Sequence, residues 1–447
     1  MDIAAFLQRN VIPVTGCSEP AAIAYAAAVA YHAISGCIPP DFSGSTGPAY
    51  STRDILSVEI TLDRNVSKNS ACALIPGMEG RKGPAAAAAA GIFLDPRDGI
   101  DLFSGMTPEK RAKAVVIALS DRISCSTVSG TGSGITPDIT VGIIAGTKNG
   151  IKKAQAHITG QHNHVASISA EGREIYSNPG IPPDSADERV PGEVIWLIRI
   201  AESMDGEEID TVFRGVEMNM TLSECCRDQA YGLGLGHTLK ALLSSQKGTT
   251  SLIDNVRIAA AVAADARMGG APYPVMSTAG SGNQGITALI PVGVVGRECR
   301  FSKADIARAA LISHMMTKQA DRYAGHLSAL CGCSIKAGIG AAAGVAYLIG
   351  GGEEEITTAI NLMVANITGT ICDGAKPACS LKIATAAGLA TECAFLAAGG
   401  MRIPTENGII QRTAEGTIRT LEKISRAMAP VDAAVLQILE RKATCFR

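Results

Sequence analysis

The sequence has no excess of basic residues. Its 447 residues include 40 Lys and Arg against 42 Asp and Glu, which gives a formal net charge of −2. A protein that binds nucleic acid mainly through charge needs a basic surplus to neutralise phosphates. This composition therefore argues against nucleic acid as a partner.

Aromatic residues are also scarce. They make up 4% of the chain, whereas glycine is frequent at 48 residues. The interior must therefore be filled mainly by small and aliphatic side chains. Hydrophobic residues make up 47% of the chain, which is enough for a sizeable core and excludes intrinsic disorder.

Segments that would direct the chain to a membrane are lacking as well. The first ten residues have neither the basic start nor the apolar run of a signal peptide, so we expect a cytoplasmic protein. The most apolar stretches, 84–94 and 337–352, are too short or too rich in glycine for the ~20 residues of a spanning helix. We expect no membrane contact, and a homo-oligomer is compatible with the sequence.

Cysteine, in contrast, is abundant, with 13 residues. An odd number in a reducing compartment does not form a disulfide framework. The remaining roles are buried apolar thiols, metal ligands or a catalytic thiol.

The order of predicted elements indicates an α+β fold. Alternating residues predict a strand at 55–62 and further strands within 139–144 and 154–168, and an alanine-rich helix is predicted at 18–33 with Ser18 as its cap. The segment 177–191, rich in Pro, Gly and Asp, is the expected boundary. We expect a mixed α/β region at 1–180 and a predominantly helical region at 192–447. The predicted helices of the second region are 195–202, 209–235, 252–267, 303–323, 335–348, 356–368, 381–397 and 413–440.

Two cysteine groups lie in the helical region, Cys331 with Cys333 and Cys372 with Cys379. Their gaps of one and six residues do not match the paired spacing of structural zinc sites. Three soft thiolates from Cys333, Cys372 and Cys379 suit an iron–sulfur cluster, and a four-iron cluster held this way keeps one iron open as a Lewis acid. Spacing alone leaves open that all are ordinary buried core cysteines.

A further cysteine, Cys17, directly precedes the predicted helix at 18–33. Amide groups and the dipole at a helix N-terminus lower the pKa of a thiol, so Cys17 is a candidate base or nucleophile. Glu19 in the same turn opposes formation of the thiolate. A small packing residue remains the alternative.

A glycine-rich loop at 280–285 matches G-x-G-x-x-G, but a Pro-containing segment precedes it where a dinucleotide-binding fold needs a strand. Its amide groups, with Ser277, Ser281 and Asn283, suit a small anion such as a substrate carboxylate. The similar loop at 129–134 is a second candidate. A tight turn without a ligand is the alternative for both loops.

The same loop also suits a pyridoxal phosphate enzyme, which needs a Schiff-base lysine. Lys68 is the nearest candidate, but it lies more than two hundred residues upstream. We consider this interpretation weaker.

Two histidines, His162 and His164, alternate along a predicted strand and would share one face. Such a pair can bind a metal, but we favour structural or surface roles for both.

Several motifs taken together resemble the L-cysteine desulfidase family, which is related to iron–sulfur L-serine dehydratase alpha chains. They occur in order from Cys17 to Cys379, so the resemblance covers essentially the whole chain. The motifs are Gly16-Cys17-Ser18-Glu19-Pro20, Asn65-Val66-Ser67-Lys68-Asn69, Ile75-Pro76-Gly77, Gly280-Ser281-Gly282-Asn283-Gln284-Gly285-Ile286-Thr287, Cys331-Gly332-Cys333 and Cys372-Asp373-Gly374-Ala375-Lys376.

The resemblance implies a [4Fe-4S] cluster on Cys333, Cys372 and Cys379, with Cys331 as a rival to Cys333. It also implies that Cys17 accepts the substrate proton. The expected substrate-binding residues are Lys68, Asn69, Ser277, Ser281 and Asn283.

We therefore predict a lyase of amino-acid catabolism that acts without pyridoxal phosphate. The first candidate reaction is β-elimination of L-cysteine to pyruvate, ammonia and hydrogen sulfide. The alternatives are elimination of water from L-serine, a pyridoxal-phosphate-dependent lyase and a cluster-bearing redox sensor.

Overall fold

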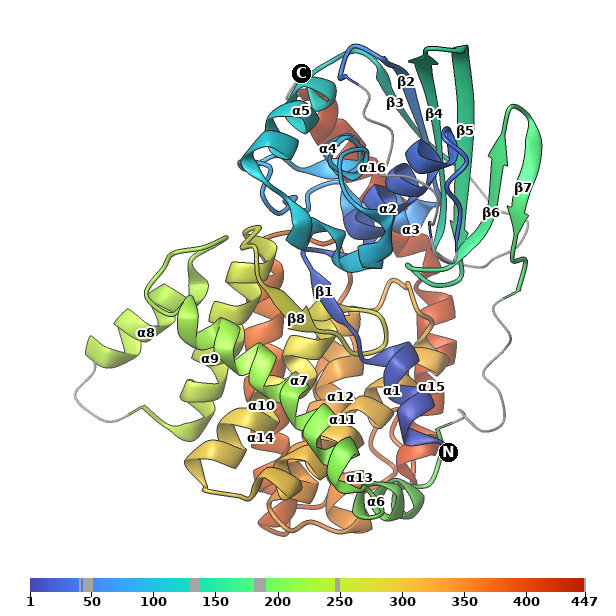
Figure 1. Cartoon of the computed structure of the whole chain (residues 1–447). Coiled ribbons are helices and arrows are strands. Elements are labelled where there is room, and N and C mark those ends of the chain that lie inside the picture. Colours follow the sequence, from blue (N-terminus) through green and yellow to red (C-terminus); the bar gives the residue numbers. More distant parts are fainter. Residues whose placement is uncertain (40–41, 43–50, 129–136, 181–189, 246–249, 446–447) are drawn as a thin grey trace.

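The computed structural model describes residues 1–39, 42, 51–128, 137–180, 190–245 and 250–445. Figure 1 shows a sheet-containing part above a larger helical part. The predicted α+β class is confirmed.

A single mixed sheet forms the upper part. Its strand order is β3-β2-β4-β5-β6-β7, and all neighbours are antiparallel except β2 and β3. The strand predicted at 55–62 is confirmed as β2, because its alternating apolar residues face the core. The bounds are β2 Ile55–Leu62, β3 Ile123–Thr127, β4 Asp138–Thr147, β5 Gly150–Thr159, β6 Val165–Ala170 and β7 Arg173–Ser177.

The helix α2 (Ser18–Ala33) packs against the sheet and is buried along nearly its whole length. Small alanine side chains let it approach both β4 and the helix α4 (Gly83–Gly91). The helix was predicted at these bounds, but the predicted cap is wrong. Cys17 is the N-cap residue, and the buried hydroxyl of Ser18 has no hydrogen-bond partner among the described residues. The other helical elements of this part are α3 Arg64–Ser70, η1 Pro96–Gly105 and α5 Pro108–Ala118.

The helical part packs around α12, whose neighbours include α10, α11, α13 and α14. The bounds are α6 Val194–Glu202, α7 Gly206–Cys225, α8 Leu235–Ser245, α9 Leu252–Met268, α10 Gly282–Glu298, α11 Lys303–Ala324, η3 Gly332–Lys336, α12 Ala337–Leu348, α13 Glu353–Ile367, α14 Cys379–Ala398, α15 Ala414–Ala427 and α16 Ala429–Cys445.

Two predicted helices are wrong in their extent. The helix expected at 209–235 ends at Cys225, and beyond it Gly232 and Gly234 adopt positive φ angles where the chain turns toward α8. The helix expected at 413–440 is divided into α15 and α16 just before Pro430, which lacks an amide hydrogen. The helices α8 and α10 were not separately predicted.

One described helix, α14, is long and apolar enough to cross a membrane by length and composition alone. It packs against α9, α12 and α13 in the helical part, and 56% of its most apolar window is buried.

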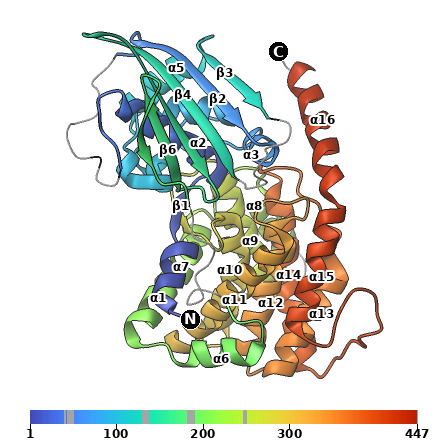
Figure 2. The same ribbon diagram turned by 90° about the vertical axis from the view of Figure 1, so that its right-hand side faces the viewer.

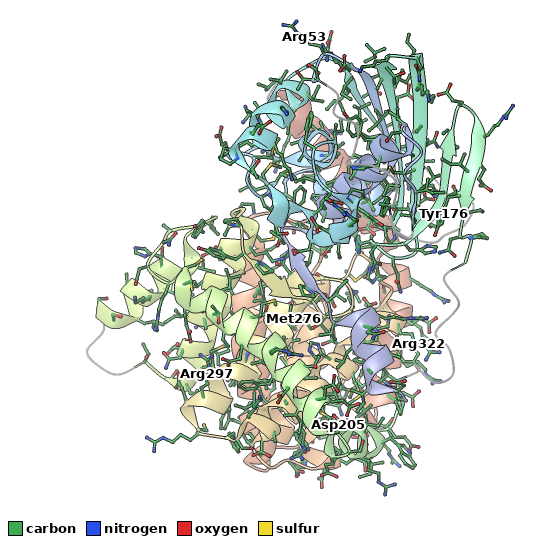
Figure 3. All side chains as sticks on the ribbon, viewed as in Figure 1. Arg53, Tyr176, Asp205, Met276, Arg297 and Arg322 are labelled. Atoms are coloured by element: carbon green, nitrogen blue, oxygen red, sulfur yellow. The ribbon has the colours of Figure 1, made fainter. Side chains whose placement is uncertain are left out.

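A short strand pair joins the two parts. The strand β1 (Pro13–Thr15) pairs antiparallel with β8 (Pro274–Met276), and the side-chain amide of Asn219 donates to the carbonyl of Met276 at 3.1 Å. Figure 3 labels Met276 at this junction. The loop that follows β8 is therefore held where the two parts meet.

Both ends of the chain also extend between the parts. The helix α1 (Ile3–Asn10) lies beside the helical part in Figures 1 and 2. At the other end, α16 runs upward and contacts α3 (Figure 2). The division at 181–191 remains a prediction, and residues 181–189 lie outside the described residues.

Candidate active site

A cavity of about 80 Å³ lies where the sheet-containing and helical parts meet. It is bordered by the start of α2, the turn between β5 and β6, the start of α10 and the two cysteine segments. Seven of the nine predicted site residues line it, namely Cys17, Asn69, Ser281, Asn283, Cys333, Cys372 and Cys379.

Four cysteines of the helical part line the cavity and form what we call the thiol face: Cys331, Cys333, Cys372 and Cys379. Backbone hydrogen bonds join their two segments, since the amide of Cys331 donates to Thr370 at 2.9 Å and that of Cys372 to Ala329 at 2.7 Å. Cys379 is the first residue of α14. Sequence positions about forty residues apart are thus brought to one surface.

Most of these thiols are held in the protonated form. Burial raises the pKa of Cys372, and it raises that of Cys379 to about 11. The Sγ atoms of Cys331 and Cys333 lie 3.4 Å apart, and this hydrogen bond lowers the pKa of Cys331 to about 7 while raising that of Cys333. Binding of a metal centre would therefore release protons from this face.

Among the described residues, no three His, Cys, Asp or Glu side chains are arranged to hold a single metal ion. A cluster distributes its cysteine ligands over several irons, so it does not require three sulfur atoms around one point. The donor set, four soft thiols facing one small cavity, is the chemistry that such clusters use.

A second group of lining residues, which we call the acid–base face, consists of Cys17, Glu19, Asn69 and His162. The thiol of Cys17 donates to Glu19 at 3.1 Å, and the side-chain amide of Asn69 donates to the other oxygen of Glu19 at 2.8 Å. Asn69 also accepts a hydrogen bond from Cys372 at 3.7 Å, so it contacts both faces.

The predicted lowering of the Cys17 pKa is wrong. Burial and the charge of Glu19 raise the pKa well above its usual value, and they outweigh both the position at the helix N-terminus and the nearby Arg267. For Glu19, burial raises the pKa, but the charge that His162 can carry and the hydrogen bonds from Cys17 and Asn69 lower it by more. Cys17 is therefore a thiol beside a carboxylate.

The interpretation of His162 and His164 also needs correction. They lie in the turn between β5 and β6 rather than along a strand, so they do not share a face. His162 is buried at the cavity, 5.5 Å from the ring of His326, and burial lowers its pKa to about 4. His164 instead bonds the carbonyl of Thr159.

Two lysines at the cavity are paired with carboxylates. Lys336 is 1% exposed and donates to Asp321 at 2.6 Å, and Lys382 donates to Asp373 at 2.5 Å. Asp321 also contacts His326, at 3.2 Å. Among the described residues, the cavity has no lysine without a carboxylate partner, which weakens the Schiff-base alternative.

Two predicted substrate-binding residues do not line the cavity. Ser277 is fully buried and accepts a hydrogen bond from the amide of Ile12 at 3.2 Å, so it supports the strand pair β1–β8. Lys68 is 1% exposed and forms an ion pair with Asp432 of α16. The second candidate loop, 129–134, lies outside the described residues.

Several cavity residues were not predicted from the sequence as site residues. Among them, Arg267 interrupts the apolar run of α9 and is buried, which is a signal the sequence contained. The others carry no comparable local signal. They are Glu19, His162, Gln284, His326, Lys336, Asp373 and Lys382.

A family model described as the serine dehydratase alpha chain matches residues 97–437. The match spans most of the chain and includes the loop at the start of α10 and all four cysteines of the thiol face. The chain therefore belongs to the serine dehydratase alpha chain family.

Three curated relatives are proteins named UPF0597. The chain is 32% identical to that of Desulforapulum autotrophicum, covering 98% of this chain and 96% of the relative. It is 33% identical to that of Alkaliphilus metalliredigens, over 97% and 93%, and 33% identical to that of Clostridium perfringens, over 98% and 97%. The narrower resemblance to L-cysteine desulfidases stays a prediction.

Proposed function

We propose that this protein is an iron–sulfur lyase that removes the β-substituent of a small L-amino acid. The observation that carries the proposal is the cavity itself, which gathers Cys17, the loop at the start of α10 and the four thiols from positions up to 362 residues apart, counted from Cys17 to Cys379. Residues of three separate motifs share one small space. Core cysteines alone would not require this convergence.

The family favours L-serine as the first substrate to test, since its description names serine dehydratase. Elimination of water from L-serine gives an enamine, which tautomerises and hydrolyses to pyruvate and ammonia. L-Cysteine is the second candidate, and it would release hydrogen sulfide in place of water. Both substrates need the same removal of the α-proton and loss of a β-substituent.

Cys333, Cys372 and Cys379 would hold the cluster, with Cys331 as a rival to Cys333. When bound, a cluster with one iron free of protein thiolate supplies Lewis acidity for the leaving group. The lysines Lys376 and Lys382 lie close enough for their charge to favour the thiolate forms of nearby cysteines. Positive charge beside the thiol face supports an anionic ligand set there.

Removal of the α-proton is assigned to Cys17 with Glu19. Because burial raises the pKa of the Cys17 thiol well above its usual value, the thiol must first transfer its proton before it can act as a base. The carboxylate of Glu19 already accepts the hydrogen bond from that thiol and is the acceptor in place. Asn69 holds Glu19 in this orientation.

A cluster-bearing redox sensor is less well supported. A sensor needs cysteine ligands but has no use for a thiol–carboxylate pair or a polar loop that face the same cavity.

A cytoplasmic location is also proposed, since the cysteines whose side chains are described are all free thiols.

The test is anaerobic reconstitution with iron and sulfide, followed by parallel assays with L-serine and L-cysteine. We expect pyruvate from at least one of them, with sulfide measured in the second assay. Failure to incorporate iron, or failure to form pyruvate from either amino acid in iron-loaded protein, would reject the proposal. The ratio of kcat/KM for the two amino acids decides between water and sulfide as the leaving group.

A further inference from the structure

Arg267 is the buried cation at the cavity that has no carboxylate partner. Its side chain is 2% exposed and it lines the cavity from α9. The nearby lysines differ, since buried Lys336 pairs with Asp321, buried Lys68 with Asp432 and partly exposed Lys382 with Asp373. Within the described residues, Arg267 forms no ion pair.

The hydrogen bonds of Arg267 leave one edge of its guanidinium group without a partner. Nη1 donates to the side-chain oxygen of Asn283 at 2.7 Å and contacts the sulfur of Met268 at 3.6 Å. Nε and Nη2 are buried and have no hydrogen-bond partner among the described residues. These two donors are adjacent on the planar group, which is the arrangement that binds a carboxylate through two parallel hydrogen bonds.

The loop at the start of α10 is built around this guanidinium group. A Cβ atom at Gly282 would lie 2.4 Å from Nε of Arg267, so a larger residue would displace the arginine. Asn283, the next residue, orients Nη1. Glycine at position 282 therefore avoids a clash with Nε of Arg267.

An unpaired buried cation is costly, because the charge and its donors lose hydration. A ligand that brings one negative charge and two acceptor oxygens offsets this cost. The carboxylate of an amino acid has this chemistry, and the cavity also contains the groups assigned above to the α-proton and the leaving group.

We propose that Arg267 is the carboxylate-binding residue of this cavity and that Asn283 and Gly282 position it. The identity of the ligand as an amino acid rests on the proposed function. The sequence analysis assigned the substrate carboxylate to hydroxyl and amide groups of the loop. This proposal differs, because the charged partner of the carboxylate, Arg267, comes from α9. Ser281 and Asn283 act beside it.

The experiment compares two ligands that cannot undergo elimination, L-alanine and L-alaninamide. They differ only in the carboxylate, and their dissociation constants are measured by calorimetry on anaerobically reconstituted protein. The wild type should prefer L-alanine. R267M should bind L-alanine about tenfold to a hundredfold more weakly and lose the preference, and R267K should recover only part of it.

R257M is the matched control, since Arg257 lies on the same helix with a side chain that is 42% exposed. It should keep the affinity and the preference of the wild type. G282A is the second variant if R267M does not fold, and it should lose the preference in the same way.

A wild type that binds both ligands equally, or binds neither, would overturn the inference. So would R267M or G282A with the carboxylate preference intact. The proposed function is tested separately. If the protein prefers L-alanine through Arg267 but forms no pyruvate from L-serine or L-cysteine, the carboxylate-binding site stands and the assignment as a lyase is rejected.

Discussion

The two faces of the cavity differ in how they manage charge. The acid–base face, contributed by the sheet-containing part, holds a carboxylate through neutral donors, the thiol of Cys17 and the amide of Asn69. The thiol face, contributed by the helical part, is flanked by lysines that are themselves paired with carboxylates, as Lys382 is with Asp373. One face is suited to exchange a proton, and the other to hold an anionic centre.

Because the two faces have different roles, substitutions in each face should cause different losses. Damage to the acid–base face should remove proton transfer and leave metal binding intact. Damage to the thiol face should remove both. Asn69 contacts Glu19 and Cys372, so its loss should affect both faces mildly.

The largest effect that separates the faces is expected from C17S. A serine hydroxyl at this position cannot replace the thiol as a base, so kcat should fall about 10²-fold to 10⁴-fold. The iron content of the reconstituted variant should equal that of the wild type. C125S, at an exposed cysteine of β3, is the control and should keep full activity. Loss of iron in C17S would show that the two faces are not separable.

The buried pair Lys336–Asp321 next to the thiol face should matter more for stability than the half-exposed pair Lys382–Asp373. K336M leaves Asp321 buried without its main partner and should lower the free energy of unfolding by about 3–5 kcal/mol. K382M should cost at most about 1 kcal/mol, because its partners are partly solvated. Urea unfolding of the protein without iron measures both.

The loss in K336M should depend on pH. Burial raises the pKa of Asp321, but Lys336 and His326 lower it by more, so the carboxylate is ionised in the folded protein. A depressed carboxyl pKa stabilises the fold above the unfolded pKa of about 4, and this stabilisation is lost as pH falls. The difference between wild type and K336M should thus persist down to about pH 4 and shrink below it. A loss independent of pH would indicate a packing effect.

The two charged side chains near Cys17, Glu19 and Arg267, should shift the pH at which its thiol reacts in opposite directions. Glu19 raises the pKa of Cys17 and Arg267 lowers it, after the larger effect of burial. E19Q should therefore shift alkylation of Cys17 by iodoacetamide to lower pH, and R267M should shift it to higher pH. Mass spectrometry of the labelled peptide in protein without iron measures both profiles. Equal shifts in one direction would contradict the assigned contacts.

The smallest effect is expected from N69A, which removes one hydrogen bond to Glu19 and one from Cys372. The kcat should fall about tenfold. N65A, the same substitution on the same helix α3, removes a side chain that does not line the cavity and should leave kcat unchanged. A loss in N65A as large as that in N69A would point to general damage of α3.

The sequence predicted the residues that belong to short motifs. Cys17, Asn283 and Cys379 each lie at the start of a helix and belong to short motifs that can be recognised locally, and all three line one cavity. The strand at 55–62 was predictable from its local pattern, since burial alternates with a period of two from Val58 to Leu62.

The charged partners could not be predicted, because they depend on contacts between distant segments. Lys68 belongs to a motif near the site, yet its ammonium group pairs with Asp432, 364 residues away. The pKa of Cys17 rises because tertiary burial outweighs the helix N-terminus. His162 lies in a turn whose position relative to Glu19 follows from the packing of α2 on the sheet.

The most direct test of the two-face interpretation measures iron content and pyruvate formation on the same reconstituted samples of C379A and C393A. Both substitutions remove a buried cysteine of α14, but Cys379 lines the cavity and Cys393 does not. We predict that C379A loses iron and lyase activity together, while C393A keeps both. Full lyase activity in C379A without bound iron would contradict the role assigned to the thiol face.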